Sequence, residues 1–162
     1  MIPSDHFTRF YNEVFKFLES RGEEALTAYW LEISKSQSML TLDLFREKGM
    51  EGMRQYWEHI RIEENCDMDL DLNDDRLELR MNACPSLSKI QDNDAKPMER
   101  YCDHCAGWIG PIMDTLGYHL VYDVIDRQKP QCVMRVFKDK QKALESEKRA
   151  QLLMRWSGKL SD

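Results

Sequence analysis

The stretch "CDMDLDLNDDRLELRMNAC", residues 66–84, alternates apolar and polar side chains with almost no interruption. An extended chain places successive side chains on opposite faces, so this alternation separates an apolar face from a polar one. The apolar positions are Met68, Leu70, Leu72, Leu77, Leu79 and Met81. The polar residues 73–75 interrupt the pattern where a turn is needed. The stretch predicts an antiparallel hairpin with one face in water, and its alternating aspartates lie on that face. They are not read as a calcium-binding loop, because the glycine that such a loop needs is missing.

A second hairpin is predicted in "YHLVYDVIDRQKPQCVMRVF", residues 118–137, with strands over about 118–125 and 131–137. A helix from about 99 to 116, ended by Gly117, precedes it. Hairpins join antiparallel strands, whereas parallel strands need long crossovers. The pattern therefore predicts an α+β fold with an antiparallel sheet.

The first part of the chain, residues 1–63, shows the spacing of helices. Apolar side chains recur three and four positions apart in three runs, which Gly22 and Gly49 separate. Many of these side chains are aromatic, and we expect them to form core and to cover one face of the sheet. An aromatic-lined ligand pocket between the helices and the sheet is the alternative.

Two polar segments complete the chain. Residues 85–100 form a connection that is long for a structureless loop, so a short helix or a function is expected there. Residues 139–162 predict a charged C-terminal helix and tail, and the terminal helices are the candidates for a homo-oligomer contact. The thin apolar stripe of the tail consists of Leu144, Leu152, Leu153 and Trp156. We expect residues 1–162 to form a single domain, with a sheet-and-helix part at 66–138.

The composition argues against several classes of protein. A net charge of −6 over 162 residues is unsuited to a general nucleic-acid binder, which needs a basic surface. The chain has no run of about 18 apolar residues, so no membrane span is expected. The N-terminus "MIPSDHFTRF" lacks the features of a signal peptide and reads as a helix start. We therefore expect a cytoplasmic protein whose five cysteines are reduced.

Four of the five cysteines stand near predicted element ends. Cys84 follows the second strand, Cys102 and Cys105 open the long helix, and Cys132 begins the last strand. An antiparallel sheet can bring these ends to one rim, so the topology predicts that the four thiols converge. Cys66 is expected to be structural, and a core role is the alternative for Cys105 because free cysteine is often buried.

Three kinds of chemistry suit such a cluster. The first is a zinc site with the four thiolates as ligands and His104 as an alternative ligand. The second is a redox dithiol, with the pKa of Cys102 lowered at a helix N-terminus, although the βαβ unit of thioredoxin-like proteins is missing upstream. The third is catalysis on a small molecule. Helix geometry directs His104 away from the two sulfurs beside it, so a base from another element, such as His119, Asp123 or His59, is more plausible.

The second half of the chain, roughly residues 66–138, resembles the L-2-amino-thiazoline-4-carboxylic acid hydrolase family and its relatives. The likeness lies in a strand ending in Cys-Pro, a helix beginning with a cysteine and an acidic residue, and a hairpin with a late cysteine. These are "MNACPSL", "YCDHC" and "LGYHLVYDVIDRQKPQCVMRVF". The matching positions are Cys84, Cys102, Asp103 and Cys132. His104 and Cys105 depart from the family pattern, which does not require a C-x-x-C.

The resemblance implies a small-molecule hydrolase that acts on a C=N bond of a cyclic thiazoline-type substrate. A thiolate, or a water on a metal held by thiolates, would attack the ring carbon. The candidate catalytic residues are Cys84, Cys102, Asp103 and His119. The side chains expected to line the substrate pocket are Trp57, Tyr101, Trp108 and Tyr118. The order of elements also resembles vinyl-reductase-type sensor domains, which implies a non-enzymatic zinc- or ligand-binding domain as the alternative. A thiol-disulfide oxidoreductase is the third hypothesis.

Overall fold

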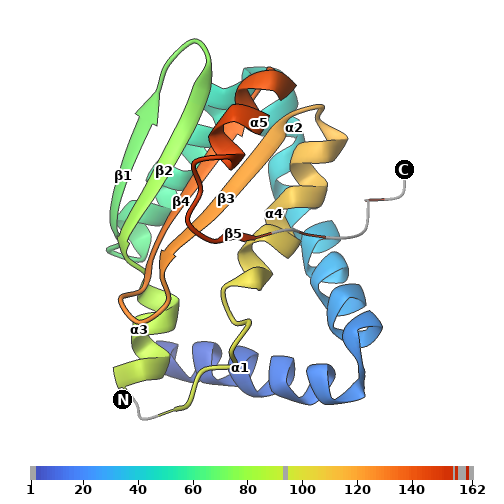
Figure 1. The fold of residues 1–162 in the computed structure, drawn as a ribbon, viewed down its shortest axis with the longest axis vertical. Helices are drawn as coiled ribbons and strands as arrows, with labels where there is room; N and C mark the ends of the chain where they lie inside the picture. The colour runs from blue at the N-terminus through green and yellow to red at the C-terminus, as the bar shows by residue number, and fades with distance from the viewer. Residues whose placement is uncertain (1–2, 93–94, 155, 157–159, 161–162) are drawn as a thin grey trace.

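The computed structural model of the chain describes residues 3–92, 95–154, 156 and 160. Two long helices come first, and two hairpins with short helices follow (Figure 1). The helices are α1 (Pro3–Arg21), α2 (Glu23–Glu63), α3 (Pro85–Asp92), α4 (Asp103–Thr115) and α5 (Lys140–Glu147). The strands are β1 (Asp67–Leu72), β2 (Arg76–Ala83), β3 (His119–Asp126), β4 (Gln131–Phe137) and β5 (Leu153–Met154). The predicted α+β class is confirmed.

The five strands form one antiparallel sheet in the order β1-β2-β4-β3-β5. Both predicted hairpins are confirmed, because β1 pairs with β2 and β3 pairs with β4. β2 also pairs with β4, which places Met81 opposite Cys132 and Leu77 opposite Val136. This pairing joins the two hairpins and brings their apolar faces to the same side of the sheet.

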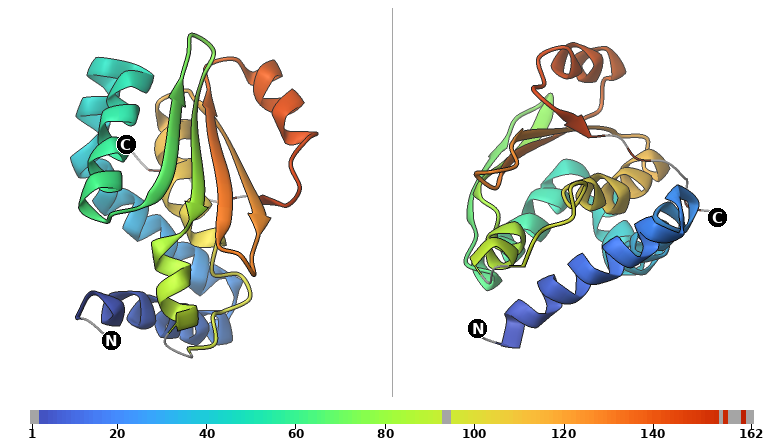
Figure 2. Two further views of the ribbon diagram at one scale, coloured as in Figure 1. Left: turned by 90° about the vertical axis from the view of Figure 1, so that its left-hand side faces the viewer. Right: turned by 60° about the horizontal axis from the view of Figure 1, so that its bottom comes forward.

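Helices cover the two faces of the sheet unequally (Figure 2). α2 and α4 pack against each other and against the apolar face of the strands. α5 packs on the opposite face, over β3 and β4. α1 lies across one end of the molecule, where it contacts α2 and α3.

A small apolar cluster of Val121, Phe137 and Ala143 packs α5 on the sheet, and two further clusters hold the other layers together. The larger lies between the sheet and helices α2 and α4, where Phe45, Ile112 and Val136 are at most 1% exposed. The smaller lies where α1, α2 and α3 meet the segment before α4. Its buried members are Phe15, Leu26, Trp30, Leu87, Ile90, Met98 and Tyr101. Many aromatic residues of the first 63 therefore serve as core.

The two glycines that separate the predicted helical runs both have positive φ angles. Gly22 lies between α1 and α2 with φ of 114°. Gly49 has φ of 59° and ψ of −139°, and it kinks α2 without ending it. Residues with a Cβ rarely adopt such angles, which explains glycine at both positions. The second and third predicted helices are the two arms of the kinked α2.

The prediction for the C-terminal tail is partly wrong. Helix α5 ends at Glu147, and Leu153 lies in β5, opposite Asp123 of β3. The Asp123 carboxylate accepts hydrogen bonds from the backbone N–H groups of Gln151 (2.9 Å) and Leu152 (3.0 Å). These long-range bonds draw the chain onto the free edge of β3, although its apolar spacing suits a helix. Residues 155, 157–159 and 161–162 of the predicted tail lie outside the described residues.

The polar connection at 85–100 carries the short helix α3, in line with its length. Residues 93–94 of this connection lie outside the described residues. Among the helices that the structure describes, none is both long and apolar enough to cross a membrane.

Candidate functional site

Four cysteines from three separate segments line one small cavity of about 20 Å³. Cys84 directly follows β2, Cys102 and Cys105 stand at the start of α4, and Cys132 lies in β4. The remaining lining residues are Leu87, Tyr101, His104, Tyr122, Pro130 and Gln131. The convergence expected from the topology is found, and we call this group the thiol cavity.

Backbone pairing explains why the thiols meet. The N–H of Cys84 donates to the carbonyl of Pro130 at 2.7 Å, which ties the end of β2 to the turn before β4. Cys132 is paired with Val124 of β3 on one side and with Met81 of β2 on the other. Helix α4 packs on the same face of the sheet and adds its first turn to the cavity wall.

Two polar side chains face the sulfurs. The Tyr122 hydroxyl donates to the Sγ of Cys132 at 3.3 Å. His104 contacts the carbonyl oxygen of Tyr101 through Nδ1, and its Nε2 lies 3.4 Å from the Sγ of Cys105. A carbonyl oxygen only accepts, so Nδ1 carries the ring proton and Nε2 presents its lone pair to the Cys105 thiol.

Burial keeps these groups neutral at neutral pH. It raises the pKa of Cys84 to about 11, with a further contribution from Cys105. It raises the pKa of Cys102 to about 12 and also raises the pKa values of Cys105 and Cys132. Burial lowers the pKa of His104 to about 4. The expected lowering of the Cys102 pKa is therefore wrong, because desolvation outweighs the dipole of the helix.

The predicted orientation of His104 is also wrong. Helix geometry alone directs adjacent side chains apart, yet His104 shares the cavity with both Cys102 and Cys105. Cys102 lies before the first residue of α4, so it is not held on the helix surface. The bond between His104 and the Tyr101 carbonyl then turns the imidazole toward Cys105.

Asp103 lies beside the thiol cavity but does not line it. Its carboxylate accepts from the Nε of Arg100 at 2.9 Å and from an Nη of Arg127 at 3.2 Å. Arg100 also pairs with Glu23 of α2. Asp103 therefore links the start of α4 to the β3–β4 turn and, through Arg100, to α2. This is a structural role.

His119 lies at the other end of β3 from the thiol cavity. It pairs with Phe137, whereas Val124, five residues further along β3, pairs with Cys132. A strand rises about 3.3 Å per residue, so His119 is on the order of 16 Å along the sheet from the position of Cys132. The structure does not place this predicted base within reach of the thiols.

Of the four aromatic residues predicted to line a substrate pocket, only Tyr101 borders the thiol cavity. Its hydroxyl bonds to Ser86 at 2.7 Å. Trp108 packs behind His104, with ring centroids 4.5 Å apart. Trp57 belongs to the main core, where it contacts Phe45. The fourth, Tyr118, lies beside the kink of α2 at Gly49.

An open groove of about 900 Å³ adjoins the thiol cavity. Leu87, Tyr101 and Cys102 border both, so Cys102 connects the groove with the other sulfurs. Cationic side chains from three segments line the groove. They are Lys16, Lys96 and Arg127.

Sequence reasoning did not select Arg127, which lies in the turn between β3 and β4. Its Nη groups bond to Asp103 and to the carbonyl of Glu99. Its Nε is buried without a hydrogen-bond partner among the described residues. Arg127 also counteracts part of the rise in the Cys102 pKa that burial causes. The only signal for it in the sequence was its place in a polar turn close to Cys132.

Metal coordination needs more than proximity. Within the residues that the structure describes, no group of three or more His, Cys, Asp or Glu side chains is already arranged to hold a metal ion. All five cysteines are free of disulfides, and burial raises the pKa of each thiol of the cavity, so these thiols are protonated at neutral pH. Sulfur and imidazole donors suit a soft cation. In this structure, however, the thiols are neutral and are not arranged around a common centre.

Relatives do not assign a role to this site. No protein-family model, curated protein sequence or solved structure matches the chain.

Proposed function

We propose that the chain is a non-enzymatic binding domain whose thiol cavity takes up one soft metal ion, with zinc as the first candidate. The observation that carries the proposal is the meeting of four cysteines from three segments at a single cavity of about 20 Å³. A cavity of that size holds about one small ion or water and leaves no room for an organic substrate.

The donor chemistry supports this proposal. Zinc prefers thiolate sulfur and imidazole nitrogen, and four cysteines complete a structural site. Cys84, Cys102, Cys105 and Cys132 are the proposed ligands. His104 is the alternative, because a proton on Nδ1 bonded to a carbonyl is the usual arrangement of a metal-ligating histidine. Bound metal would supply a crosslink between the end of β2, the start of α4 and β4.

The raised thiol pKa values make the proposal specific. Cysteine coordinates as thiolate, so metal uptake must displace protons from groups whose pKa values are about 11 and 12 at Cys84 and Cys102. Binding at pH 7 should therefore release about four protons per ion if all four ligands are thiolates. It also requires the sulfurs to move closer together than they are in the structure.

The test is metal analysis of protein purified without chelator. We expect about one zinc ion per chain, lost in Cys102→Ser and in Cys132→Ser. Cys66→Ser is the matched control, since Cys66 is a buried thiol outside the cavity. Calorimetric titration in two buffers of different ionisation enthalpy counts the released protons. Metal-free protein in which the native thiols bind no added zinc would refute the proposal.

A second candidate function is hydrolysis of a small cyclic thiazoline-type acid in the groove. It is favoured by the place of Cys102 in the groove wall together with Lys16, Lys96 and Arg127, which suit a carboxylate-bearing ligand. Hydrolysis adds the oxygen of one water to the C=N carbon, after which a bond from that carbon to a ring heteroatom breaks and the heteroatom takes up the proton. The pKa of about 12 at Cys102 opposes its use as a thiolate nucleophile, which is why this function ranks second.

Ring-opening assays on thiazoline carboxylates separate the two candidates. The hydrolase predicts turnover that is lost in Cys102→Ala and falls in Arg127→Gln, with Arg46→Gln as the charge-matched control on the exposed surface of α2. Protein that is fully loaded with metal and shows no turnover would support a non-enzymatic metal-binding function. Turnover that survives in Cys102→Ala would remove Cys102 from the reaction.

Self-association is proposed through α1. Phe7, Phe10 and Phe17 are 68%, 61% and 56% exposed. Together with Val14 they are spaced three, four and three residues apart, which is the spacing of a seam that two copies of one helix supply to each other. Light scattering should show a dimer that Phe10→Gln with Phe17→Gln converts to monomer. A wild-type monomer at high concentration would refute this contact.

A further inference from the structure

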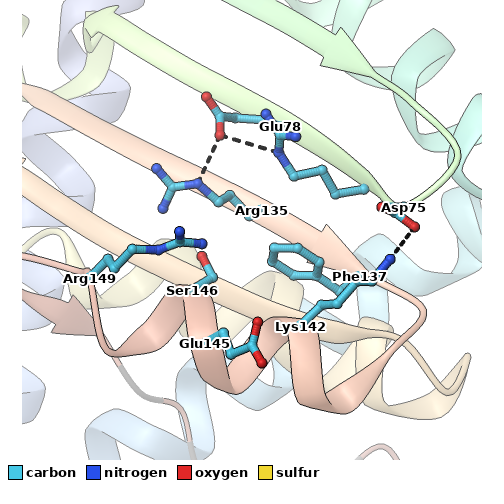
Figure 3. A pocket seen from close by; sticks show the side chains of 9 residues that line it. Asp75, Glu78, Arg135, Phe137, Lys142, Glu145, Ser146 and Arg149 are labelled. Carbon is cyan, nitrogen blue, oxygen red and sulfur yellow. Dashed lines mark hydrogen bonds and ion pairs between the residues drawn. The ribbon is translucent and has the colours of Figure 1, made fainter.

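The outer face of the sheet carries a second recess that the proposed function does not use. It has a volume of about 570 Å³ and lies between the strands β2 and β4 and the helix α5 (Figure 3). Its lining residues are Asp75, Arg76, Glu78, Arg135, Phe137, Lys142, Glu145, Ser146 and Arg149. We call it the outer groove. It lies on the opposite face of β4 from Cys132, because side chains alternate along the strand.

Cations outnumber carboxylates in the outer groove, although the whole chain has a net charge of −6. Three arginines share one carboxylate, that of Glu78. The nearest nitrogen–oxygen distances to Glu78 are 2.8 Å from Arg135, 3.3 Å from Arg80 and 3.5 Å from Arg76. Arg76 also pairs with Asp71 at 3.2 Å. A guanidinium has five N–H donors, so the bond to Glu78 leaves most of the donors of Arg135 unused.

Two arginines that line the outer groove, Arg135 and Arg149, have unused hydrogen-bond donors. Arg135 bonds to Glu78 through Nε alone, which leaves both of its Nη groups available. Arg149 has no ion-pair or hydrogen-bond partner for its side chain within the described part of the chain. Arg135 of β4 and Arg149, which follows the end of α5, line the same groove together with Ser146 (Figure 3). Like charges placed together in this way favour an anion between them.

We propose that the outer groove binds a small molecule through an oxyanion, either phosphate or carboxylate, held by Arg135 and Arg149. Guanidinium groups pair with both oxyanions through parallel hydrogen bonds, which gives the contact its geometry. Ser146 supplies a further donor, Lys142 adds positive charge while it pairs with Asp75, and the ring of Phe137 forms part of the floor. A volume of about 570 Å³ suits a metabolite rather than a macromolecule.

The proposal is tested by calorimetric titration at constant ionic strength with phenyl phosphate, benzoate and inorganic phosphate. We expect saturable binding of at least one probe, weakened about tenfold or more by Arg149→Gln and by Arg135→Gln. Arg149→Gln is the primary variant because Arg149 is exposed and its loss leaves the fold intact. Arg46→Gln removes the same charge from an exposed site on α2 and should leave binding unchanged.

The outcomes assign or remove the site. Tighter binding of phenyl phosphate than of benzoate identifies phosphate as the recognised group, and the reverse order identifies carboxylate. Equal weakening in Arg149→Gln and Arg46→Gln would reduce the effect to general electrostatics and overturn the proposal. The absence of binding of all three probes at about 10 mM would overturn it as well. The test does not involve the thiols, so it stands apart from the metal proposal.

Discussion

The pKa values of ionisable side chains shift in line with burial on one face of the sheet and against the direction expected from burial alone on the other. On the inner face, Cys132 and the other thiols lie in an apolar cavity, and burial raises the pKa of each. On the outer face, burial also acts to raise the pKa of Glu78. There the hydrogen bond from Arg135 and the charges of Arg135, Arg76 and Arg80 outweigh it, so the pKa is lowered. A countercharge within reach, rather than burial itself, decides whether a group stays ionised.

This difference indicates what each face can bind. The inner face holds neutral donors that become anionic only when a cation displaces their protons. The outer face holds guanidinium donors in excess of their acceptors, which suits an anion.

The largest effect is expected from removing apolar volume on the inner face. Leu79 is 5% exposed and packs in the main core, whereas its neighbour Arg80 points to the outer face. Leu79→Ala should lower the free energy of unfolding by about 2–5 kcal/mol because it leaves a cavity. Arg80→Ala should change it by less than about 0.5 kcal/mol. Urea unfolding at pH 7 measures both, and similar losses in the two variants would contradict the two-faced sheet.

Acid should destabilise the thiol cavity through His104. Its pKa is about 4 in the folded protein, below the usual value of 6.5, so the unfolded chain binds a proton between those values and the folded chain does not. Stability therefore falls as the pH drops from about 6.5 to 4, by about 3 kcal/mol for this group. Urea unfolding at pH 7 and pH 4.5 should show a smaller difference for His104→Gln than for wild type.

His59→Gln is the control for that measurement. His59 is an exposed histidine on α2, where it pairs with Glu63. This variant removes an imidazole outside the thiol cavity, so the contribution of His104 to the pH dependence should remain. If His104→Gln and His59→Gln respond alike, the imidazole of His104 is not buried in its neutral form.

Glu78 should show the opposite chemistry on the outer face. Its lowered pKa means that it adds stability above about pH 4.5 and that this contribution disappears as the pH falls through the folded-state value. Glu78→Gln should cost about 1–2 kcal/mol at pH 7, because hydrogen bonds to a charged group are lost. The free energies of unfolding of variant and wild type should converge once the pH is below the folded-state pKa of Glu78. A constant difference from pH 7 to pH 3 would show that charge is not involved.

The smallest effect is expected from the hydroxyl of Tyr122. It donates to a thiol sulfur, which is a weak acceptor. Tyr122→Phe should therefore lower the free energy of unfolding by about 1 kcal/mol or less. Tyr118→Phe is the control, since Tyr118 lies outside the thiol cavity. A loss above about 3 kcal/mol would place Tyr122 in a stronger polar network than the structure shows.

Local patterns in the sequence were sufficient to predict the two hairpins. The alternation around Leu77 and Leu79 reflects the period of a strand and needs no distant partner. The convergence of the cysteines was also within reach, because strand ends adjoin at one rim of an antiparallel sheet. The strand in the tail could not be predicted from local sequence, since Leu153 joins the sheet by pairing with Asp123, which lies 30 positions earlier.

The α+β class, the two hairpins and the meeting of four cysteines follow from the amino-acid sequence, because side-chain period and element order are local properties. Long-range contacts are what turn His104 toward Cys105, set His119 at the far end of β3 and keep the thiols neutral. Orientation, register and burial depend on contacts between distant segments. The reactivity of the cluster depends on these contacts, whereas its existence follows from the order of elements along the chain.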